Sequence, residues 1–311
     1  MKNILAVILF WPLVSTAADI ARRPAITGIS HLALYAHDLE KSRAFYRDFL
    51  GFAEPYSLIN AAGGPAIVWI KINDRQSIEL YPEKEAGSDR LNHVALETDA
   101  AAQMRDYLAS RNLPVPATVP QGKIGNRNYF IHDPDGHTVE IVEYAPAGWT
   151  RLNQGKFLPA TRIAARMPHV GILVGDLPAA KKFYEDILGF HESWRGAKNP
   201  AALSWVHEQV PDGQDFIEFM LYQQLPAADQ RGVVHHLCLE VPDLDAAADE
   251  LKMRAARIGY LRPMEIRTGT NRKRQLNLYD PDGTRVELME PHTVDGLPTP
   301  SSTAPVLPSS K

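Results

Sequence analysis

Two copies of one segment decide the fold of this chain: His31-Leu-Ala-Leu-Tyr-Ala-His-Asp-Leu39 and His169-Val-Gly-Ile-Leu-Val-Gly-Asp-Leu177. In both, apolar residues recur at strand spacing and an aspartate follows, which predicts a strand that leads into a helix. Phe-Tyr and Leu-Gly-Phe then follow in both copies, at residues 45–46 and 50–52 and again at 183–184 and 188–190. The chain therefore contains an internal duplication.

The same scheme recurs once more within each half. Residues 28–83 predict a strand, a helix and further strands, and residues 91–144 repeat this order. The second half repeats it over residues 168–221 and 234–290. Four strand–helix–strands units, two in each half, predict an α+β protein of two domains.

A set of two histidines and one glutamate occurs once in each half. The sets are His31, His93 and Glu140, then His169, His236 and Glu287. Each glutamate follows the tetrapeptide Asp-Pro-Asp-Gly, at 133–136 and 280–283, which predicts a turn before the last strand. Two imidazoles and one carboxylate hold a divalent metal while leaving positions open for a substrate. The sequence therefore predicts a metal centre.

Alternation along the predicted strand at 92–97 supports an internal polar site. His93, Ala95 and Glu97 share one face of this strand, and Val94 and Leu96 share the other. The apolar face would meet the helices, and the polar face would line a cavity. By the same alternation His235 should face away from His236. His137 lies at a predicted turn, where we expect it to be exposed.

Composition and the chain ends limit the other functions. The 311 residues carry a formal charge of −4 with no strongly basic face, which argues against nucleic-acid binding. Residues 1–18 read as a signal peptide, with a charged start, an apolar stretch over 4–14 and small residues after it. We therefore expect an exported protein, periplasmic or secreted, with no stable membrane insertion after cleavage. The single cysteine, Cys238, excludes an intramolecular disulfide.

These signals predict the domain boundaries. We expect a signal peptide at 1–18, a first domain at 27–147, a linker at 148–166 and a second domain at 167–292. Residues 293–311 are rich in proline and serine, which predicts a disordered tail.

With these motifs, the chain resembles the vicinal oxygen chelate superfamily, which includes glyoxalase I, bleomycin-resistance proteins and extradiol dioxygenases. The resemblance spans about residues 27–292. It implies two domains, each made of two paired βαβββ modules that form a half-open barrel around a metal.

The resemblance also implies ligands. It assigns His31, His93 and Glu140 in the first domain, and the set formed by His169, His236 and Glu287 in the second. Glyoxalase-like members add a fourth carboxylate, for which Glu79 and Glu218 are the candidates. Any of Fe²⁺, Mn²⁺, Ni²⁺ or Zn²⁺ fits such donors. All four glutamates are candidates for moving a proton.

Three functions follow from the resemblance. The leading one is a metal-dependent lyase, isomerase or dioxygenase acting on a small molecule chelated through adjacent oxygens. Because dioxygenases of this layout use their second domain, that domain is favoured. The alternatives are a metal-independent binding protein of the bleomycin-resistance type and an extradiol dioxygenase. Residues 272–279 and 126–132 lack the dioxygenase pattern of histidine and tyrosine, which weighs against ring cleavage. A homo-oligomer is compatible with all three.

Overall fold

A computed structural model describes residues 22–308, so the predicted signal peptide lies outside the described residues. Seven strands form the first sheet, in the order β2-β3-β4-β1-β5-β7-β6. Their bounds are β1 Gly28–Ala36, β2 Ala53–Ile59, β3 Pro65–Lys71, β4 Ser77–Pro82, β5 Leu91–Glu97, β6 Arg127–His132 and β7 Thr138–Glu143.

Eight strands form the second sheet, in the order β13-β14-β15-β12-β8-β11-β10-β9. Their bounds are β8 Arg166–Val174, β9 His191–Gly196, β10 Trp205–Gln209, β11 Phe216–Leu221, β12 His236–Glu240, β13 Ile266–Thr268, β14 Lys273–Tyr279 and β15 Arg285–Thr293. In both sheets the first strand of the domain lies at the centre, parallel to one neighbour and antiparallel to the other (β1 between β4 and β5, and β8 between β11 and β12).

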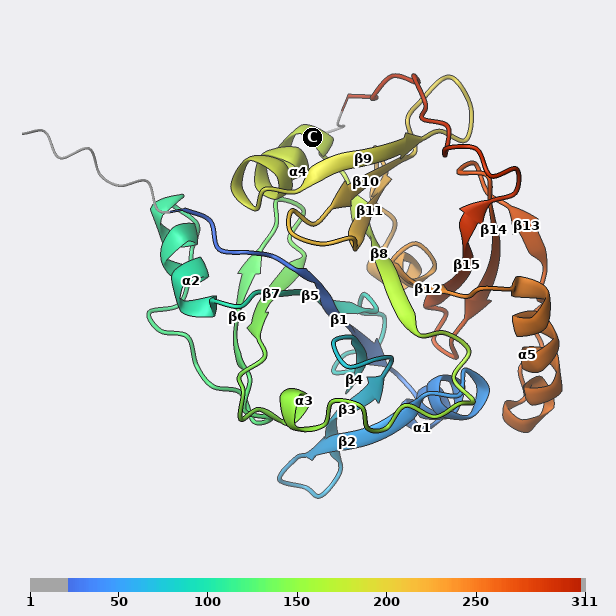
Figure 1. The fold of residues 1–311 in the computed structure, drawn as a ribbon, viewed down its shortest axis with the longest axis horizontal. Helices are drawn as coiled ribbons and strands as arrows, with labels where there is room; N and C mark the ends of the chain where they lie inside the picture. Colours follow the sequence, from blue (N-terminus) through green and yellow to red (C-terminus); the bar gives the residue numbers. More distant parts are fainter. Residues whose placement is uncertain (1–21, 309–311) are drawn as a thin grey trace, which may run out of the picture.

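Short helices flank the sheets (Figure 1). They are α1 Leu39–Ala44, α2 Ala101–Ser110, α3 Trp149–Leu152, α4 Leu177–Lys181 and α5 Leu244–Ile258, with π-helical turns η1 Phe45–Phe49 and η2 Lys182–Ile187 and a 3₁₀ turn η3 Ala228–Val233. The aspartates of the repeated segment cap their helices, since Asp38 accepts from the amide of Lys41 and Asp176 from that of Ala179. Among the described residues, no helix is long and apolar enough to cross a membrane.

This is the predicted α+β fold of two domains, each built from two modules. One module differs from the βαβββ scheme. After α2, an isolated bridge between Gln121 and Arg127 stands where the second domain has β13. The preceding segment contains Pro114, Pro116 and Pro120, and proline cannot donate to a strand ladder.

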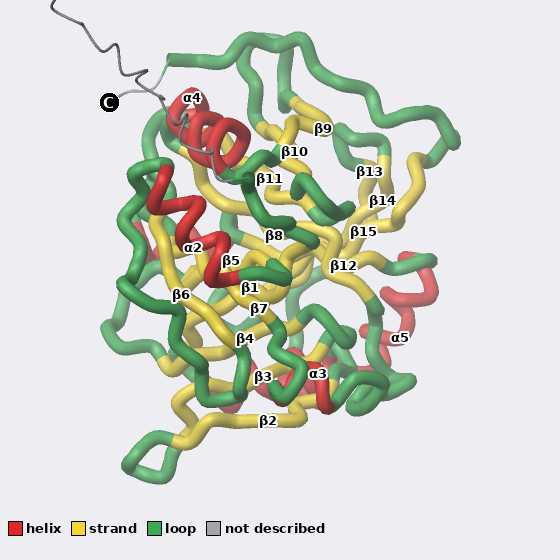
Figure 2. Tube along the Cα trace, turned by 60° about the vertical axis from the view of Figure 1, so that its left-hand side comes forward, coloured by secondary structure: helices red, strands yellow, loops and turns green. Residues whose placement is uncertain are grey.

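The two domains pack through their repeated motifs. Tyr46 of the first Phe-Tyr pair donates to Asp280 of the second domain at 3.2 Å, and Tyr184 donates to Asp133 of the first domain at 3.1 Å. Helix α1 accordingly lies beside α5 (Figure 1), and α2 lies beside α4 (Figure 2). Each Asp-Pro-Asp-Gly turn therefore holds a helix of the other domain.

A buried glutamine joins the central strands of the two domains. The amide nitrogen of Gln76 donates to Met167 O at 2.8 Å and to Ile29 O at 3.2 Å, and its oxygen accepts from Met167 N at 2.9 Å. Asp215, from the second domain, accepts from the amide of Ile29 at 3.0 Å. Strands β1 and β8 are thereby fixed side by side (Figure 1).

The C-terminal segment differs from the expected disordered tail. Residues 294–308 run in an extended path over β9 (Figure 1), where Trp194 Nε1 donates to Pro300 O at 2.7 Å. Two backbone hydrogen bonds also attach the segment. The amide of Ser302 donates to Arg195 O at 2.9 Å, and the amide of Leu203 donates to Pro305 O at 2.8 Å. Backbone bonds of this kind do not depend on side-chain hydrophobicity, and composition is therefore a poor guide to them.

Candidate metal centres

The first centre lies on the inner face of the first sheet. His31 on β1, His93 on β5 and Glu140 on β7 bring their donor atoms together. His31 Nε2 lies 2.9 Å from His93 Nε2 and 3.0 Å from Glu140 Oε2, which is 2.9 Å from His93 Nε2. Glu79 on β4 adds an oxygen 3.5 Å from His31 Nε2. All four predicted residues are buried and converge.

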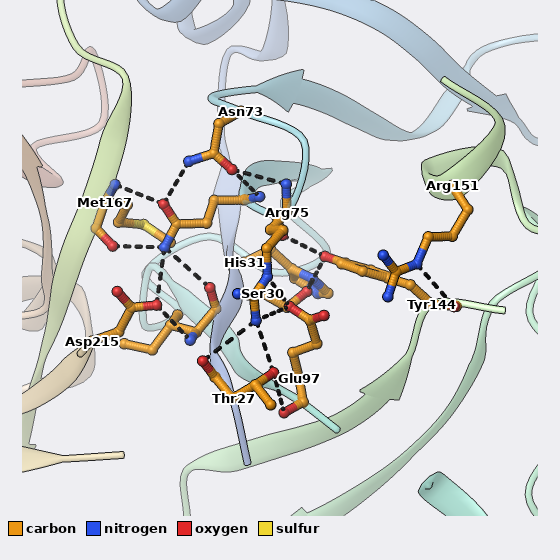
Figure 3. A network of polar contacts seen from close by, with 12 residues as sticks. Thr27, Ser30, His31, Asn73, Arg75, Glu97, Tyr144, Arg151, Met167 and Asp215 are labelled. Atoms are coloured by element: carbon orange, nitrogen blue, oxygen red, sulfur yellow. Dashed lines mark hydrogen bonds and ion pairs between the residues drawn. The ribbon is translucent and has the colours of Figure 1, made fainter. Parts of the chain in front are cut away.

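Hydrogen bonds on the far side of His31 fix its ring. Ser30 Oγ lies 2.9 Å from His31 Nδ1 and 2.5 Å from the hydroxyl of Tyr144, which donates to Arg75 O at 2.7 Å (Figure 3). A partner on one ring nitrogen orients the other toward a metal. His93 Nδ1 has an equivalent partner, Asn92 Oδ1, at 2.9 Å.

The charges of this centre are strongly coupled. Burial opposes a charge on His31, but the carboxylates of Glu79 and Glu140 outweigh burial and raise the pKa of His31 to about 9. Burial likewise opposes ionisation of Glu140, yet His31 and His93 lower its pKa to about 2. The carboxylates thus stabilise positive charge at the position where the donor atoms meet.

A cavity of about 150 Å³ opens onto this centre. Three of the four donors, His31, Glu79 and Glu140, line it. The remaining wall combines apolar and aromatic residues, among them Trp69 and Trp149, with polar ones such as Lys71 and Arg75. A small molecule in the cavity would therefore contact the donors directly.

The second centre lies at the corresponding place of the second sheet. His169 Nε2 lies 3.3 Å from His236 Nε2 and 3.4 Å from Glu287 Oε2. Glu218 Oε2 is 3.3 Å from His236 Nε2. Glu218 pairs with Gly171 on β8 as Glu79 pairs with Ala33 on β1, so the two glutamates are structurally equivalent.

The position of the His236 ring requires a glycine at residue 171. A Cβ atom at position 171 would meet the His236 ring at 1.9 Å. Because no side chain fits there, the imidazole lies directly against the β8 backbone. In the first domain the same position holds Ala33, which pairs with His93.

Sequence reasoning missed one histidine of the second centre, His207. It lies on β10 directly opposite Glu218, and its Nε2 is 3.0 Å from Glu218 Oε1. Burial lowers the pKa of both His207 and His169, so both imidazoles are neutral near pH 7. The alternation of Trp205-Val-His-Glu-Gln209 with the next strand was the available signal, because it places His207 and Glu218 on one face.

The hollow beside the second centre reaches fewer of its donors. It measures about 270 Å³ and is lined by His207 but by none of the other four candidate donors, and Thr299 of the C-terminal segment also lines it. Arg285 also places its guanidinium 2.6 Å from His236 Nδ1, where a positive charge opposes a cation. The corresponding strand position in the first domain is Thr138, which carries no charge.

The donor sets fit a divalent metal. Both combine imidazole nitrogens with carboxylate oxygens, the donors that Fe²⁺, Mn²⁺, Ni²⁺ and Zn²⁺ accept in proteins. In each predicted triad the donor atoms lie within 4.8 Å of one another. These buried polar atoms have mainly each other as partners, which a shared cation would satisfy.

Three other residues considered in the sequence analysis, His235, His137 and Cys238, are not among the candidate donors. His235 faces away from His236, as expected, but it is buried at the domain interface, 3.3 Å from Asp89. His137 is half-buried rather than exposed and contacts Asp133 at 2.8 Å. Cys238 is buried, and burial raises the pKa of its thiol.

The sequence matches the family model of the Glyoxalase/Bleomycin resistance protein/Dioxygenase superfamily over residues 28–141 and 166–288. The chain belongs to this superfamily. Its two matched stretches are the two domains seen in the sheets.

Some relatives of this chain are about as long as one of its two domains. The uncharacterised protein YaeR of Escherichia coli is 30% identical over 128 residues, which cover 39% of this chain and 93% of YaeR. Glyoxylase I 4 of Arabidopsis thaliana is 28% identical, over 37% of this chain and 70% of its own. Homoprotocatechuate 2,3-dioxygenase of Brevibacterium fuscum has a similar structure, with a TM-score of 0.66, 18% identity and coverage of 87% and 73% of the two chains. That likeness shows a shared fold.

Proposed function

We propose that the protein is a metal-dependent enzyme whose working site is the first centre. Its substrate would be a small molecule with two adjacent oxygens, bound in the cavity beside His31, Glu79 and Glu140. The observation that carries this proposal is the opening of the cavity onto three of the four donors. The sequence favoured the second domain, where the hollow reaches only His207.

His31, His93 and Glu140 would hold the metal, with Glu79 as the fourth donor. When bound, such a metal acts as a Lewis acid toward the two oxygens of the substrate. Glu79 also accepts a hydrogen bond of 2.9 Å from the hydroxyl of Tyr81, which lines the same cavity. This carboxylate is therefore placed to take a proton from the substrate and to return it.

The aromatic wall would orient the substrate and limit water. Trp69 is buried and contacts Tyr56, whose ring centroid lies 5.2 Å away and which also contacts Trp149 at 5.7 Å. The ammonium of Lys71 holds the connector that carries Trp149, through Asn153 O and Lys156 O, both at 2.8 Å. An apolar wall near charged donors strengthens their electrostatic effect on a bound molecule.

The test combines metal analysis with substrate screening. We expect the purified protein to bind a divalent metal at the first centre. The substitution H93A should remove the ion of that centre, and with it turnover of any compound found in a panel of α-hydroxy ketones, hemithioacetals, acyl thioesters and catechols. H236A, in the other domain, should retain turnover. If H236A abolishes turnover and H93A does not, the working site is the second centre.

The same screen separates the two alternatives. Oxygen uptake with a catechol by the iron-loaded protein would identify a ring-cleaving dioxygenase, an activity carried by a solved protein of similar fold. Ligand binding that survives complete chelation would identify a binding protein. Loss of binding on chelation, without oxygen uptake, supports the proposed lyase or isomerase chemistry.

We also propose that the protein is exported. The support is the charged, apolar and small-residue pattern of residues 1–18. Fractionation of expressing bacteria, with N-terminal sequencing of the mature protein, is the test. A chain that stays in the cytoplasm and whose N-terminal sequence still begins at residue 1 or 2 would contradict export.

A further inference from the structure

We propose that the second centre is a closed metal site in which His207 is an additional ligand. This goes beyond the proposed function, which concerns the first centre. The donor set would be three imidazoles and two carboxylates, from His169, His207, His236, Glu218 and Glu287. The class of ligand is a divalent transition-metal ion, retained for stability and not for turnover.

The position of His207 carries the proposal. Glu218 lies between two imidazoles, 3.0 Å from His207 Nε2 and 3.3 Å from His236 Nε2. Phe216 stacks on His207 and on His169, with ring centroids 4.2 and 4.6 Å away and interplanar angles of 23° and 26°. His207 thus faces the same interior as the predicted ligands and is not a surface histidine.

Four of the five proposed donors are buried: the three histidines are at most 8% exposed and Glu287 is 5% exposed. The side chain of Glu218 is 14% exposed. Among the described residues, His169 Nδ1 is buried without a hydrogen-bond partner. Trp194 packs on His207 at 4.4 Å between ring centroids, and its own Nε1 is held by Pro300 of the C-terminal segment.

The number of donors separates the two centres. The first has four candidate side chains and a cavity that reaches three of them, which leaves room for a substrate. The second has five, but Arg285 beside His236 opposes a cation. Retention of an ion there would therefore depend on the five ligands, which must outweigh this charge. Structural sites are closed in this way, whereas catalytic sites keep a position open.

The experiment isolates the second centre with H93A and loads it with Co²⁺. We expect one equivalent of Co²⁺ to bind H93A, and the paramagnetic proton NMR spectrum to show hyperfine-shifted signals from three imidazoles. Adding H207N should remove one imidazole set and weaken Co²⁺ binding by roughly tenfold or more. H235N is the matched control, because His235 is buried beside the centre but faces Asp89.

Each outcome decides the proposal. No Co²⁺ bound by H93A, or only two imidazole sets in H93A itself, would overturn it even if H207N fails to fold. Three sets that persist in H207N would also overturn it, because His207 would then only orient Glu218. The proposed function is judged separately, by turnover with the first centre intact.

Discussion

The hydroxyls behind His31 illustrate how single residues set up the first centre. Tyr144 joins Ser30 to the carbonyl of Arg75, and Ser30 contacts the ring nitrogen that does not face the donors (Figure 3). Removing a partner of this kind leaves the ligand in place but less well oriented. Metal affinity should therefore respond to residues that never touch the metal.

We expect the substitution Y144F to weaken metal binding at the first centre by about 10- to 100-fold. It removes the bonds to Ser30 and to Arg75 O without changing the aromatic packing. Competition with a chromophoric chelator measures the change. Y129F is the control, because the buried Tyr129 hydroxyl has no hydrogen-bond partner within residues 22–308. Equal affinities of Y144F and Y129F would remove Tyr144 from the centre.

A second prediction at this scale concerns Asp280 and pH. Burial, reinforced by Asp282, raises the pKa of Asp280 from 3.8 to about 7. Between these values the unfolded chain loses a proton that the folded chain keeps, so the free energy of unfolding falls as pH rises from about 4 to about 7. We expect D280N to gain stability relative to the wild type across this window, by no more than about 4 kcal/mol, and no further above it.

Urea unfolding at several pH values measures this difference. D133N is the matched control, since Asp133 holds the same turn in the first domain but contacts the His137 ring at 2.8 Å. That substitution removes a favourable partner and should destabilise the protein. A constant difference between D280N and wild type from pH 4 to 8 would contradict the assignment.

At the scale of elements, the C-terminal segment acts as part of the second domain. It supplies the acceptor for Trp194 at Pro300 and buries Ala304. Deletion of residues 294–311 should therefore lower the melting temperature by roughly 2–8 °C, the equivalent of about 1–2 kcal/mol. It should also shift tryptophan emission to longer wavelength as Trp194 meets water. Deletion of 309–311 alone is the control, and identical melting of the two truncations would contradict the prediction.

The elements also show how much of the fold and of the candidate site could be predicted from the sequence. Strand and helix patterns predicted the domains and modules, because the periodicities are local and the repeats reinforce them. The predicted triads also converge, since strand alternation fixes their faces. The partnership of Tyr46 with Asp280 was not predictable, because it joins motifs more than 200 residues apart. His207 was missed because its relation to Glu218 depends on the register of a hairpin.

At the scale of the whole molecule, the duplication has led to two unequal halves. Both keep an imidazole–carboxylate cluster at the same place in the sheet. In the first half, the connector with Trp149 forms part of the cavity wall and leaves the donors accessible. In the second, Thr299 of the C-terminal segment lines a hollow that reaches only His207 among the donors, and Arg285 lies against His236. The two domains nevertheless depend on each other, because the Asp-Pro-Asp-Gly turn of each domain holds a helix of the other domain.

The buried hydrogen bonds between Gln76 and Met167 allow this dependence to be tested. Its amide makes bonds to Met167 in both directions, at 2.8 and 2.9 Å, and all of them are buried. Q76A leaves those backbone groups unpaired, which should cost at least about 1–3 kcal/mol. We expect a single unfolding transition in the wild type and, in Q76A, lower stability with non-coincident transitions when fluorescence and circular dichroism are compared. Q209A is the control, because Gln209 bonds to Gly213 within one hairpin. If Q76A stays as stable and as cooperative as Q209A, the domains are held together by their exchanged helices and not by these hydrogen bonds.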